Sequence, residues 1–290
     1  MTPYISVIIT SFNREDCITE TIVSILKSDY QNFELIIVDD ASTDKTAAIV
    51  QEYAKLDCRI KVFKNEKNLG DYPNRNKAAS YATGKYIKFV DSDDSVYPHT
   101  LTTMVEAMEK FPSAAFGFCD RKPADNKSYP IFYTGKQALQ EHFFNKGLLL
   151  AGPSNSIIRR DCFKAIGGFS NTRYISDYEA WLKFCLQFDV VILEPILMKI
   201  RIHRGQEMDV GKLAYYHLNY NLHKDFINNP EAPFSEYERK KLLYNYKVLL
   251  SRRVYQRLIK WFGLKKTLET IKKAGESPAL LFWAFLPMKK

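Results

Sequence analysis

Three carboxylates stand together at Asp91, Asp93 and Asp94, directly after an apolar run that ends at residue 90. Like charges at this spacing repel one another unless a cation lies between them. Hard divalent cations such as Mg²⁺ and Mn²⁺ prefer carboxylate oxygens, so the cluster favours a metal or nucleotide site. The alternative is that Asp93 or Asp94 only caps the following turn, which would account for one of the three acids.

The segments that would position these acids alternate between strand and helix patterns over the first 95 residues. Short β-branched apolar runs predict buried parallel strands at 5–10, 33–38, 59–63 and 85–90, with amphipathic helices between them. This alternation implies an α/β fold with a mainly parallel sheet flanked by helices, in which ligands bind beyond the carboxyl ends of the strands. Three runs end in polar clusters, at 10–13, 39–40 and 91–94, so we expect these clusters to meet at one edge of the sheet.

The second half of the chain is less regular. Apolar periodicity predicts helices at 101–111, within 133–145 and at 177–188. Shorter apolar runs predict strands at 114–119, 156–158 and 190–202, the last interrupted by Pro195.

Composition limits the classes of protein that the chain can be. The 290 residues are 46% hydrophobic and 26% charged, which excludes a disordered or fibrous chain. The five cysteines form no C-x-x-C pair, which indicates free thiols in a reducing compartment, and we expect a cytoplasmic protein. No run approaches the ~20 apolar residues that cross a bilayer.

The net charge of +9 is concentrated near the C-terminus. Residues 236–290 carry 14 Lys and Arg against 4 Asp and Glu, whereas residues 1–235 carry 28 against 29. The body is therefore neutral, and it lacks interleaved basic and aromatic strands, so we expect no nucleic-acid partner. Something acidic is expected to meet the tail.

The tail supports two interpretations that can hold together. Residues 236–273 are predicted to be helical, with one apolar face formed by Leu243, Tyr246, Leu250, Val254, Leu258 and Trp261. That face would pack on the rest of the protein. Alternatively, the basic side chains and the aromatic run 280–286 would attach the protein to an anionic membrane surface, at the inner face of the plasma membrane.

Taken in order, the motifs resemble the family 2 glycosyltransferases with a GT-A fold. The resemblance covers roughly residues 4–205 and is carried by the segments 6–14, 34–44, 68–70, 75–76, 84–94, 159–160, 166–169, 177–182 and 201–203. It implies a catalytic domain at 1–205, with a nucleotide-binding half at 1–95 and an acceptor half at 96–205. Residues 206–290 would form a basic helical extension.

The resemblance implies an inverting transfer of a sugar from a nucleotide diphosphate donor, expected to be a UDP-sugar. The acceptor would be a hydroxyl of a glycan or a lipid-linked molecule, in bacterial surface polysaccharide synthesis. Matched to this sequence, Thr10, Phe12 and Asn13 would line the nucleotide pocket. Asp40 would bond the base, with Arg75 nearby.

The remaining matched positions belong to the metal and the base. Asp91 would reach the ribose or the metal, and Asp93 would hold a Mn²⁺ or Mg²⁺ ion on the diphosphate. His203 would contact the diphosphate or its metal, and Asp177 matches the catalytic base. The chemistry agrees, because the attacking hydroxyl needs a carboxylate to take its proton and the leaving diphosphate needs a cation.

One departure from the family pattern leaves the base open between two acids. The family usually has an acid immediately before the base, but Ser176 stands there. Glu179 is the alternative to Asp177, although two residues along a helix it would point to another side.

Two other functions are compatible with acids on an α/β sheet. A metal-dependent nucleotidyltransferase acting on sugar phosphates would also use acids on an α/β sheet, but segment 10–14 has no glycine. A non-catalytic nucleotide-sugar-binding protein is a further alternative. A dinucleotide oxidoreductase is disfavoured, because no G-x-G-x-x-G follows a strand.

Overall fold

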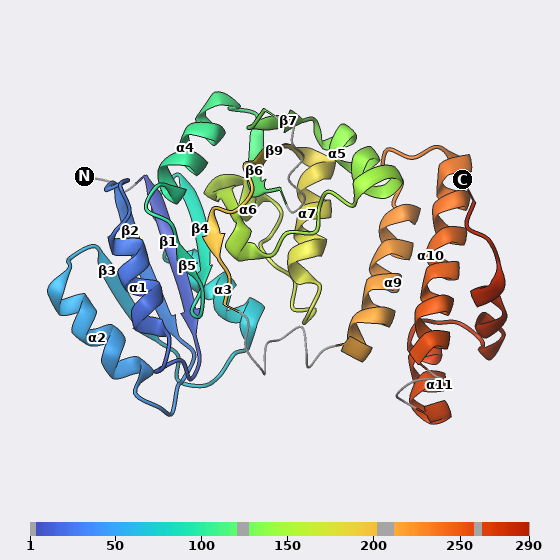
Figure 1. Cartoon of the computed structure of the whole chain (residues 1–290), viewed down its shortest axis with the longest axis horizontal. Helices are drawn as coiled ribbons and strands as arrows, with labels where there is room; N and C mark the ends of the chain where they lie inside the picture. The colour runs from blue at the N-terminus through green and yellow to red at the C-terminus, as the bar shows by residue number, and fades with distance from the viewer. Residues whose placement is uncertain (1–3, 121–127, 202–211, 258–262, 290) are drawn as a thin grey trace. The chain divides into compact units, whose positions relative to one another are not determined.

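The computed structural model describes residues 4–120, 128–201, 212–257 and 263–289. The chain forms two compact units, Met1–Ile202 and His203–Lys290 (Figure 1). The sequence placed this boundary after residue 205. Each unit is described by itself.

The first unit is built on an eight-stranded sheet. Its strands are β1 (Ile5–Ser11), β2 (Phe33–Asp39), β3 (Ile60–Lys64), β4 (Tyr86–Asp91), β6 (Ala114–Cys119), β7 (Ile131–Tyr133), β8 (Ser156–Arg159) and β9 (Asp189–Leu193). They lie in the order β3-β2-β1-β4-β8-β6-β9-β7. The first four strands are parallel, as predicted, and the other half is mixed because β8 runs antiparallel to both β4 and β6.

The helices of this unit lie between the strands along the chain. They are α1 (Ile18–Leu26), α2 (Thr46–Leu56), α3 (Asp71–Ser80), α4 (Thr100–Lys110), α5 (Gly135–Glu141), α6 (Arg160–Ala165) and α7 (Ser176–Gln187). The connections β1–β2 and β2–β3 run in one direction along the sheet, and β3–β4 returns past β1. Right-handed crossovers therefore place α1 and α2 on one face and α3 on the other.

Several short elements of this unit differ from the sequence prediction. A two-stranded sheet pairs β5 (Ser95–Val96) with β10 (Met198–Lys199), and two short helical turns are η1 (His142–Lys146) and η2 (Pro153–Asn155). The strand predicted at 190–202 is thus two strands, β9 and β10. Strand β7 was missed, since three residues carry too little alternation to be recognised.

Strand register brings the predicted polar clusters to one edge of the sheet. In β1, Thr10 pairs with Asp91 of β4, and Ser11 pairs with Asp39 of β2. These strands are buried almost throughout, and β1, β2 and β4 end in the polar residues Ser11, Asp39 and Asp91. The sequence prediction of a shared edge is confirmed.

The second unit is helical where the structure describes it. Its elements are α9 (Lys212–Asn228), α10 (Glu236–Arg257), α11 (Gly263–Lys273) and η4 (Pro278–Phe285). Leu250, Val254, Ile271 and Leu280 form its core with Tyr220. The helix predicted at 236–273 is found as α10 and α11, but the predicted face residues Leu258 and Trp261 lie outside the described residues. Helix α9 was not predicted.

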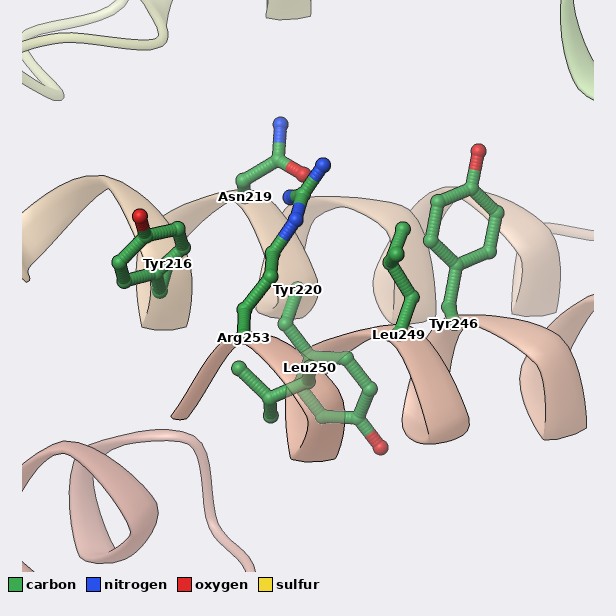
Figure 2. A pocket seen from close by; sticks show the side chains of 7 residues that line it. All are labelled: Tyr216, Asn219, Tyr220, Tyr246, Leu249, Leu250 and Arg253. Atoms are coloured by element: carbon green, nitrogen blue, oxygen red, sulfur yellow. The ribbon is translucent and has the colours of Figure 1, made fainter. Parts of the chain in front are cut away.

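A small pocket opens between α9 and α10 of this unit (Figure 2). It is lined by Tyr216, Asn219, Tyr220, Tyr246, Leu249, Leu250 and Arg253. Tyr246 also stacks on the buried His223 ring, 3.8 Å between centroids. Part of the apolar face predicted for α10 is therefore used inside this unit.

Candidate active site

Arg75 joins helix α3 to the end of strand β4. Its guanidinium donates to Asp71 Oδ1 at 2.7 Å and to Asp91 Oδ1 at 2.6 Å. Burial would raise the pKa of Asp91, but the charge and hydrogen bond of Arg75 hold it below its usual range. Burial also works against the charged guanidinium, and the two carboxylates keep the pKa of Arg75 above its ordinary value. A fixed positive charge therefore lies at the sheet edge.

The same helix reaches the predicted base. Tyr72, buried on α3, donates its hydroxyl to Asp177 Oδ1 at 2.9 Å, and Asp177 stands in the first turn of α7. Burial raises the pKa of Asp177 to about 6, although the Tyr178 amide and the Tyr72 hydroxyl oppose the shift. A carboxyl group with this pKa can take up a proton near neutral pH.

Glu179, the alternative base, has different partners. Its carboxylate accepts from Ser170 Oγ at 2.5 Å and pairs with Lys183 Nζ at 2.7 Å. These are contacts of a carboxylate that ties α7 to the turn before it. The environment of Asp177, and not that of Glu179, is the one expected of a general base.

The turn before α7 is docked on α3. Gly167 and Gly168 both have positive φ, 79° and 73°, and Phe169 is buried behind them. The Asn76 side chain donates to the Phe169 carbonyl at 2.7 Å and accepts from the Phe169 amide at 2.9 Å. This matches the tight turn with a packed aromatic that the sequence predicts.

The segment 151–155 links α7 with β4. Trp181 Nε1 donates to the Ala151 carbonyl at 2.7 Å, and Ser154 Oγ accepts from the Asp91 amide at 2.8 Å. Lys88, fully buried in β4, donates its ammonium group to the Ser154 carbonyl. Burial lowers the pKa of Lys88 to about 8. The two acids Asp91 and Asp177 are thus held by α3 and by this segment.

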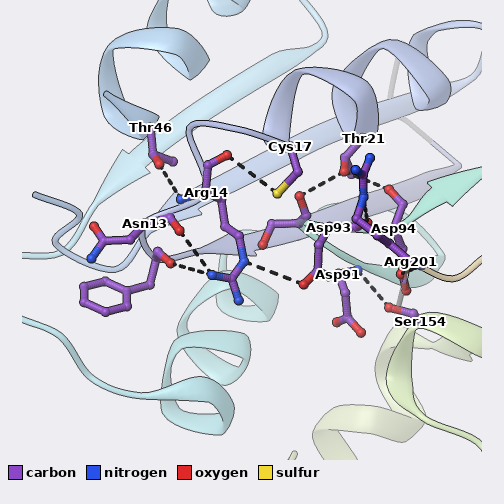
Figure 3. A network of polar contacts seen from close by, with 12 residues as sticks. Asn13, Arg14, Cys17, Thr21, Thr46, Asp91, Asp93, Asp94, Ser154 and Arg201 are labelled. Carbon is purple, nitrogen blue, oxygen red and sulfur yellow. Dashed lines mark hydrogen bonds and ion pairs between the residues drawn. The ribbon is translucent and has the colours of Figure 1, made fainter. Parts of the chain in front are cut away.

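Arginines surround the other two acids of the 91–94 cluster (Figure 3). Arg14 Nε lies 3.7 Å from Asp93 Oδ2, and the Arg201 amide donates to Asp94 Oδ1 at 3.0 Å. Burial, followed by the charge of Asp91, raises the pKa of Asp94 to about 7. The repulsion among Asp91, Asp93 and Asp94, on which the prediction of a cation was based, is therefore partly relieved by Arg14 and by the raised pKa of Asp94.

The metal prediction depends on this cluster. Among the described residues no three His, Cys, Asp or Glu side chains come together as ligands. The third predicted ligand, His203, lies outside the described residues. Asp91 and Asp93 still fit a hard ion, since Mg²⁺ is commonly held by one or two carboxylates together with substrate phosphates.

The predicted nucleotide residues occupy the edge of β1 and β2. Thr10 is partly exposed, and Phe12 is 42% exposed. Asn13, with φ 53°, accepts from the Thr43 amide at 2.9 Å and so ties the two loops together. Asp40 is buried.

Asp40, predicted to contact the nucleobase, hydrogen-bonds to other parts of the protein. Its carboxylate accepts from Asn65 Nδ2 at 2.6 Å and from the amides of Leu69 and Gly70, both at 2.9 Å. It therefore fixes the loop that leads into α3, whether or not it also touches a ligand.

Buried polar atoms without hydrogen-bond partners gather at the same edge. In the part of the chain that the structure describes, they include Ser11 Oγ, Arg14 Nε, Asp39 Oδ1, Asn65 Oδ1 and Arg75 Nη1. These residues follow or end β1, β2 and β3, or lie on α3. A buried donor or acceptor left unpaired is costly, so such a group calls for an explanation. Unsatisfied polar groups of this kind are expected near functional sites, where local rules of stability are broken.

Several of these residues were not found from the sequence. Tyr72 acts through Asp177, a partner 105 positions along the chain, for which one sequence gives no signal, whereas Asp71 lies four residues before its partner Arg75 and could have been paired with it on a helix. Lys88 did carry one, because a lysine within an apolar strand must be satisfied in the interior.

The family comparison covers most of the first unit. Residues 6–167 match the model described as "Glycosyl transferase family 2". A relative in Bacillus subtilis strain 168, named "Putative teichuronic acid biosynthesis glycosyltransferase TuaG", is 44% identical over 116 residues, which are 40% of this chain and 46% of that protein.

A second relative comes from Campylobacter jejuni serotype O:2. Named "GalNAc(5)-diNAcBac-PP-undecaprenol beta-1,3-glucosyltransferase", it is 35% identical over 118 residues, 40% of this chain and 38% of that protein. The chain thus matches less than half the length of either relative.

Two solved structures share the fold. The Staphylococcus aureus TarS fragment 1–349 in complex with UDP-GlcNAc superposes with a TM-score of 0.72 at 23% identity, over 93% of this chain and 79% of that one. The Pyrobaculum calidifontis mannosyltransferase PcManGT in complex with GDP-Man and Mn²⁺ gives 0.63 at 16% identity, over 95% and 80%. The predicted GT-A fold is confirmed.

Proposed function

The chain belongs to glycosyl transferase family 2, and we propose that it moves a sugar from a UDP-sugar to an acceptor hydroxyl with inversion at the anomeric carbon. The observation that carries this proposal is the meeting of the ends of β1, β2 and β4 at one edge of the sheet, where Thr10 pairs with Asp91 and Ser11 with Asp39. Ligands of parallel α/β sheets bind beyond this edge, and the hydroxyls and carboxylates there suit a phosphate-bearing, hydroxyl-rich ligand with its cation. The family assignment leaves the nucleotidyltransferase alternative without support.

The donor would lie along the edge formed by β1, β2 and β4. Thr10, Phe12 and Asn13 would face the nucleoside, and Asp40 would act on the base directly or by holding the loop at Gly70. Arg75 and Asp91 would then reach toward the ribose and the phosphates. The uridine nucleotide is supported by the structural neighbour TarS, which was solved in complex with UDP-GlcNAc.

Asp91 and Asp93 are the residues proposed to hold a divalent cation, with His203 as a further ligand. One structural neighbour, PcManGT, was solved in complex with Mn²⁺. When bound, the ion would neutralise charge that develops on the leaving diphosphate. The protein's own share is to present the two carboxylates beside Arg14 and Arg75, whose positive charges favour an anionic leaving group.

Asp177 is proposed as the base. The acceptor oxygen attacks the anomeric carbon, and the bond from that carbon to the phosphate oxygen breaks. The hydroxyl proton passes to the Asp177 carboxylate, and the electron pair leaves with the nucleoside diphosphate. Tyr72 holds the carboxylate oriented and ionised through its hydrogen bond.

The acceptor is proposed to be a growing surface polysaccharide, either a glycan or a lipid-linked sugar. Both relatives' names point this way: one is assigned to teichuronic acid biosynthesis, and the other acts on an undecaprenol-linked glycan. We place the enzyme in the cytoplasm, which the five free cysteines support. None of the described helices combines the length and hydrophobicity needed to cross a membrane.

The decisive test compares two acids on the same helix. UDP release from a panel of UDP-sugars, with Mn²⁺ and a polyprenyl diphosphate-linked N-acetylhexosamine as the acceptor, should fall about 10²–10⁴-fold in Asp177→Asn. Glu179→Gln should stay within a few-fold of wild type, because its contacts are with Ser170 and Lys183. Wild-type turnover by Asp177→Asn would disprove the base assignment. Donor binding without release by any variant, wild type included, would favour the non-catalytic alternative.

A further inference from the structure

The last segment of the second unit turns large apolar side chains toward solvent. In and after η4, Phe282 is 77% exposed, Phe285 70%, Met288 45% and Leu286 39%. We call these four residues the terminal patch. Leu280, two residues before it, is fully buried among Leu250, Val254 and Ile271, so the segment is anchored while the patch is not covered.

The exposure does not come from a frayed end. Ser251 Oγ donates to the Leu280 carbonyl at 2.5 Å, and Arg252 donates to the carbonyls of Ala284 and Leu286 at 3.2 and 2.8 Å. These hydrogen bonds from α10 fix the backbone on either side of Phe282.

A second clamp lies at the end of the segment. The Asn245 side chain donates to the Lys289 carbonyl at 2.9 Å and accepts from its amide at 2.8 Å. The patch is therefore presented on an ordered backbone. Exposed apolar residues that cluster and are bordered by polar groups mark interaction surfaces.

The charge around the patch is positive. Lys289 borders it directly and lies 4.6 Å from the Tyr244 ring centroid, whereas Lys247, 4.7 Å from that of Trp283, is paired with Glu276 at 2.7 Å. Over residues 236–290, basic residues outnumber acidic ones by 14 to 4. The patch is apolar and its border is cationic. A partner that matches both has an anionic surface with an apolar layer beneath it.

The shape of the patch favours a bilayer over a folded protein. The four patch residues follow one another closely along one short segment, 282–288. A lipid interface accepts exposed apolar side chains without a matching groove, whereas a protein partner would need one.

We infer that residues 278–289 dock on an anionic phospholipid bilayer, with the terminal patch entering the interface and Lys289 beside the headgroups. This goes beyond sugar transfer, because the docking depends on neither donor nor acceptor. It also combines the two sequence interpretations of the tail: part of its apolar surface packs internally, and another part is free to meet lipid.

The test is flotation of the full chain with vesicles of phosphatidylcholine alone or mixed with phosphatidylglycerol. The wild type should float with the mixed vesicles, less so at high salt, and Phe282→Ser/Phe285→Ser should reduce the bound fraction at least about tenfold. The matched control, Leu56→Ser/Ile196→Ser, removes two equally exposed apolar side chains from the first unit and should float as wild type does.

A second measurement keeps the inference testable if the double variant is poorly folded. Trp283 lies within the docking segment, so brominated lipids should quench tryptophan fluorescence in wild type and much less in Trp283→Phe. Wild type recovered free of both vesicle types, or equal flotation of wild type and patch variant, would overturn the inference. Self-association that the patch substitutions abolish, without flotation, would instead assign the patch to a second copy of the chain and overturn it too.

Discussion

Asp177 shows how the surroundings of one residue set its chemistry. A carboxyl group in water has a pKa near 4 and is a weak base at neutral pH. Burial raises the pKa of Asp177 to about 6, and the hydrogen bond from Tyr72 limits the rise. The group is therefore mostly ionised at neutral pH and still basic enough to accept a proton. In the proposed mechanism, the tyrosine adjusts the base without touching the reacting atoms.

This arrangement predicts a pH dependence with a definite sign. The proposed base works only as a carboxylate, so turnover should rise with pH through a midpoint near 6 and level off about one pH unit higher. Tyr72→Phe removes a bond that favours the carboxylate and should move the acidic limb upward by about one pH unit. The measurement is kcat/KM against pH.

A control separates positioning from folding in that experiment. Tyr81→Phe changes another tyrosine hydroxyl beside α3 and should leave the limb in place. A Tyr72→Phe profile that falls in height at every pH but keeps its midpoint would mean that the hydroxyl does not tune Asp177.

At the residue scale, sequence reasoning reached the acids but not their partners. Asp91, Asp93 and Asp177 stand out because of their types and their positions in a recognisable order. The pair Tyr72 and Asp177 is separated by 105 positions. Nothing local in a tyrosine's neighbours predicts so distant a contact.

Helices α5 and α7 show how an element far from the sheet edge supports the site. Gly135 begins α5, and a Cβ there would overlap the backbone carbonyl oxygens of Cys185 and Phe188 at the end of α7. The close approach of the two helices therefore requires glycine. Helix α7 in turn carries Asp177 at its other end.

Gly135→Ala should consequently destabilise the first unit. Backbone oxygens cannot move aside as a side chain can, and we expect a loss of about 1–3 kcal/mol, or several degrees in Tm. Differential scanning calorimetry would measure it. Gly152→Ala is the control, because its Cβ would meet nothing within 4 Å and its φ is −76°. Equal Tm values for the two variants would contradict the packing argument.

Element prediction succeeded where periodicity was strong. The four parallel strands are mostly apolar runs, and their alternation with helices along the chain predicted the shared edge. Strands β5, β7 and β10 have two or three residues each and show no usable pattern. Helix α9 was missed for another reason: its apolar residues do not gather on one side.

On the scale of the whole molecule, the uneven distribution of charge is the dominant feature. A near-neutral body carries a strongly basic C-terminal fifth, which the sequence established by counting. The sequence could not predict which apolar residues of the tail stay exposed. Leu280 and Phe282 are both large and apolar, yet Leu280 is buried and Phe282 is exposed. Only the packing of Leu280 into the helical core separates them.

If the proposed function and the docking inference both hold, substitutions in the terminal patch should slow transfer to a lipid-linked acceptor but not to a water-soluble one. Phe282→Ser/Phe285→Ser should keep the wild-type kcat/KM for a short water-soluble acceptor. On a lipid-linked acceptor held in anionic vesicles it should lose about tenfold or more, because the effective concentration at the surface falls. Equal losses on both acceptors would point to damage within the enzyme and against a role in membrane capture.

The unbroken pairing of β1 with β2 and β4 carries a consequence for how such a protein can vary. Each strand end is aligned with its neighbour, Thr10 with Asp91 and Ser11 with Asp39. Side chains alternate along a strand, so one residue deleted inside β4 would turn Asp91 to the opposite face. The same deletion in a surface turn would be absorbed. Length changes in descendants or designed variants should therefore accumulate in the connections, while the strands themselves tolerate substitution but not insertion.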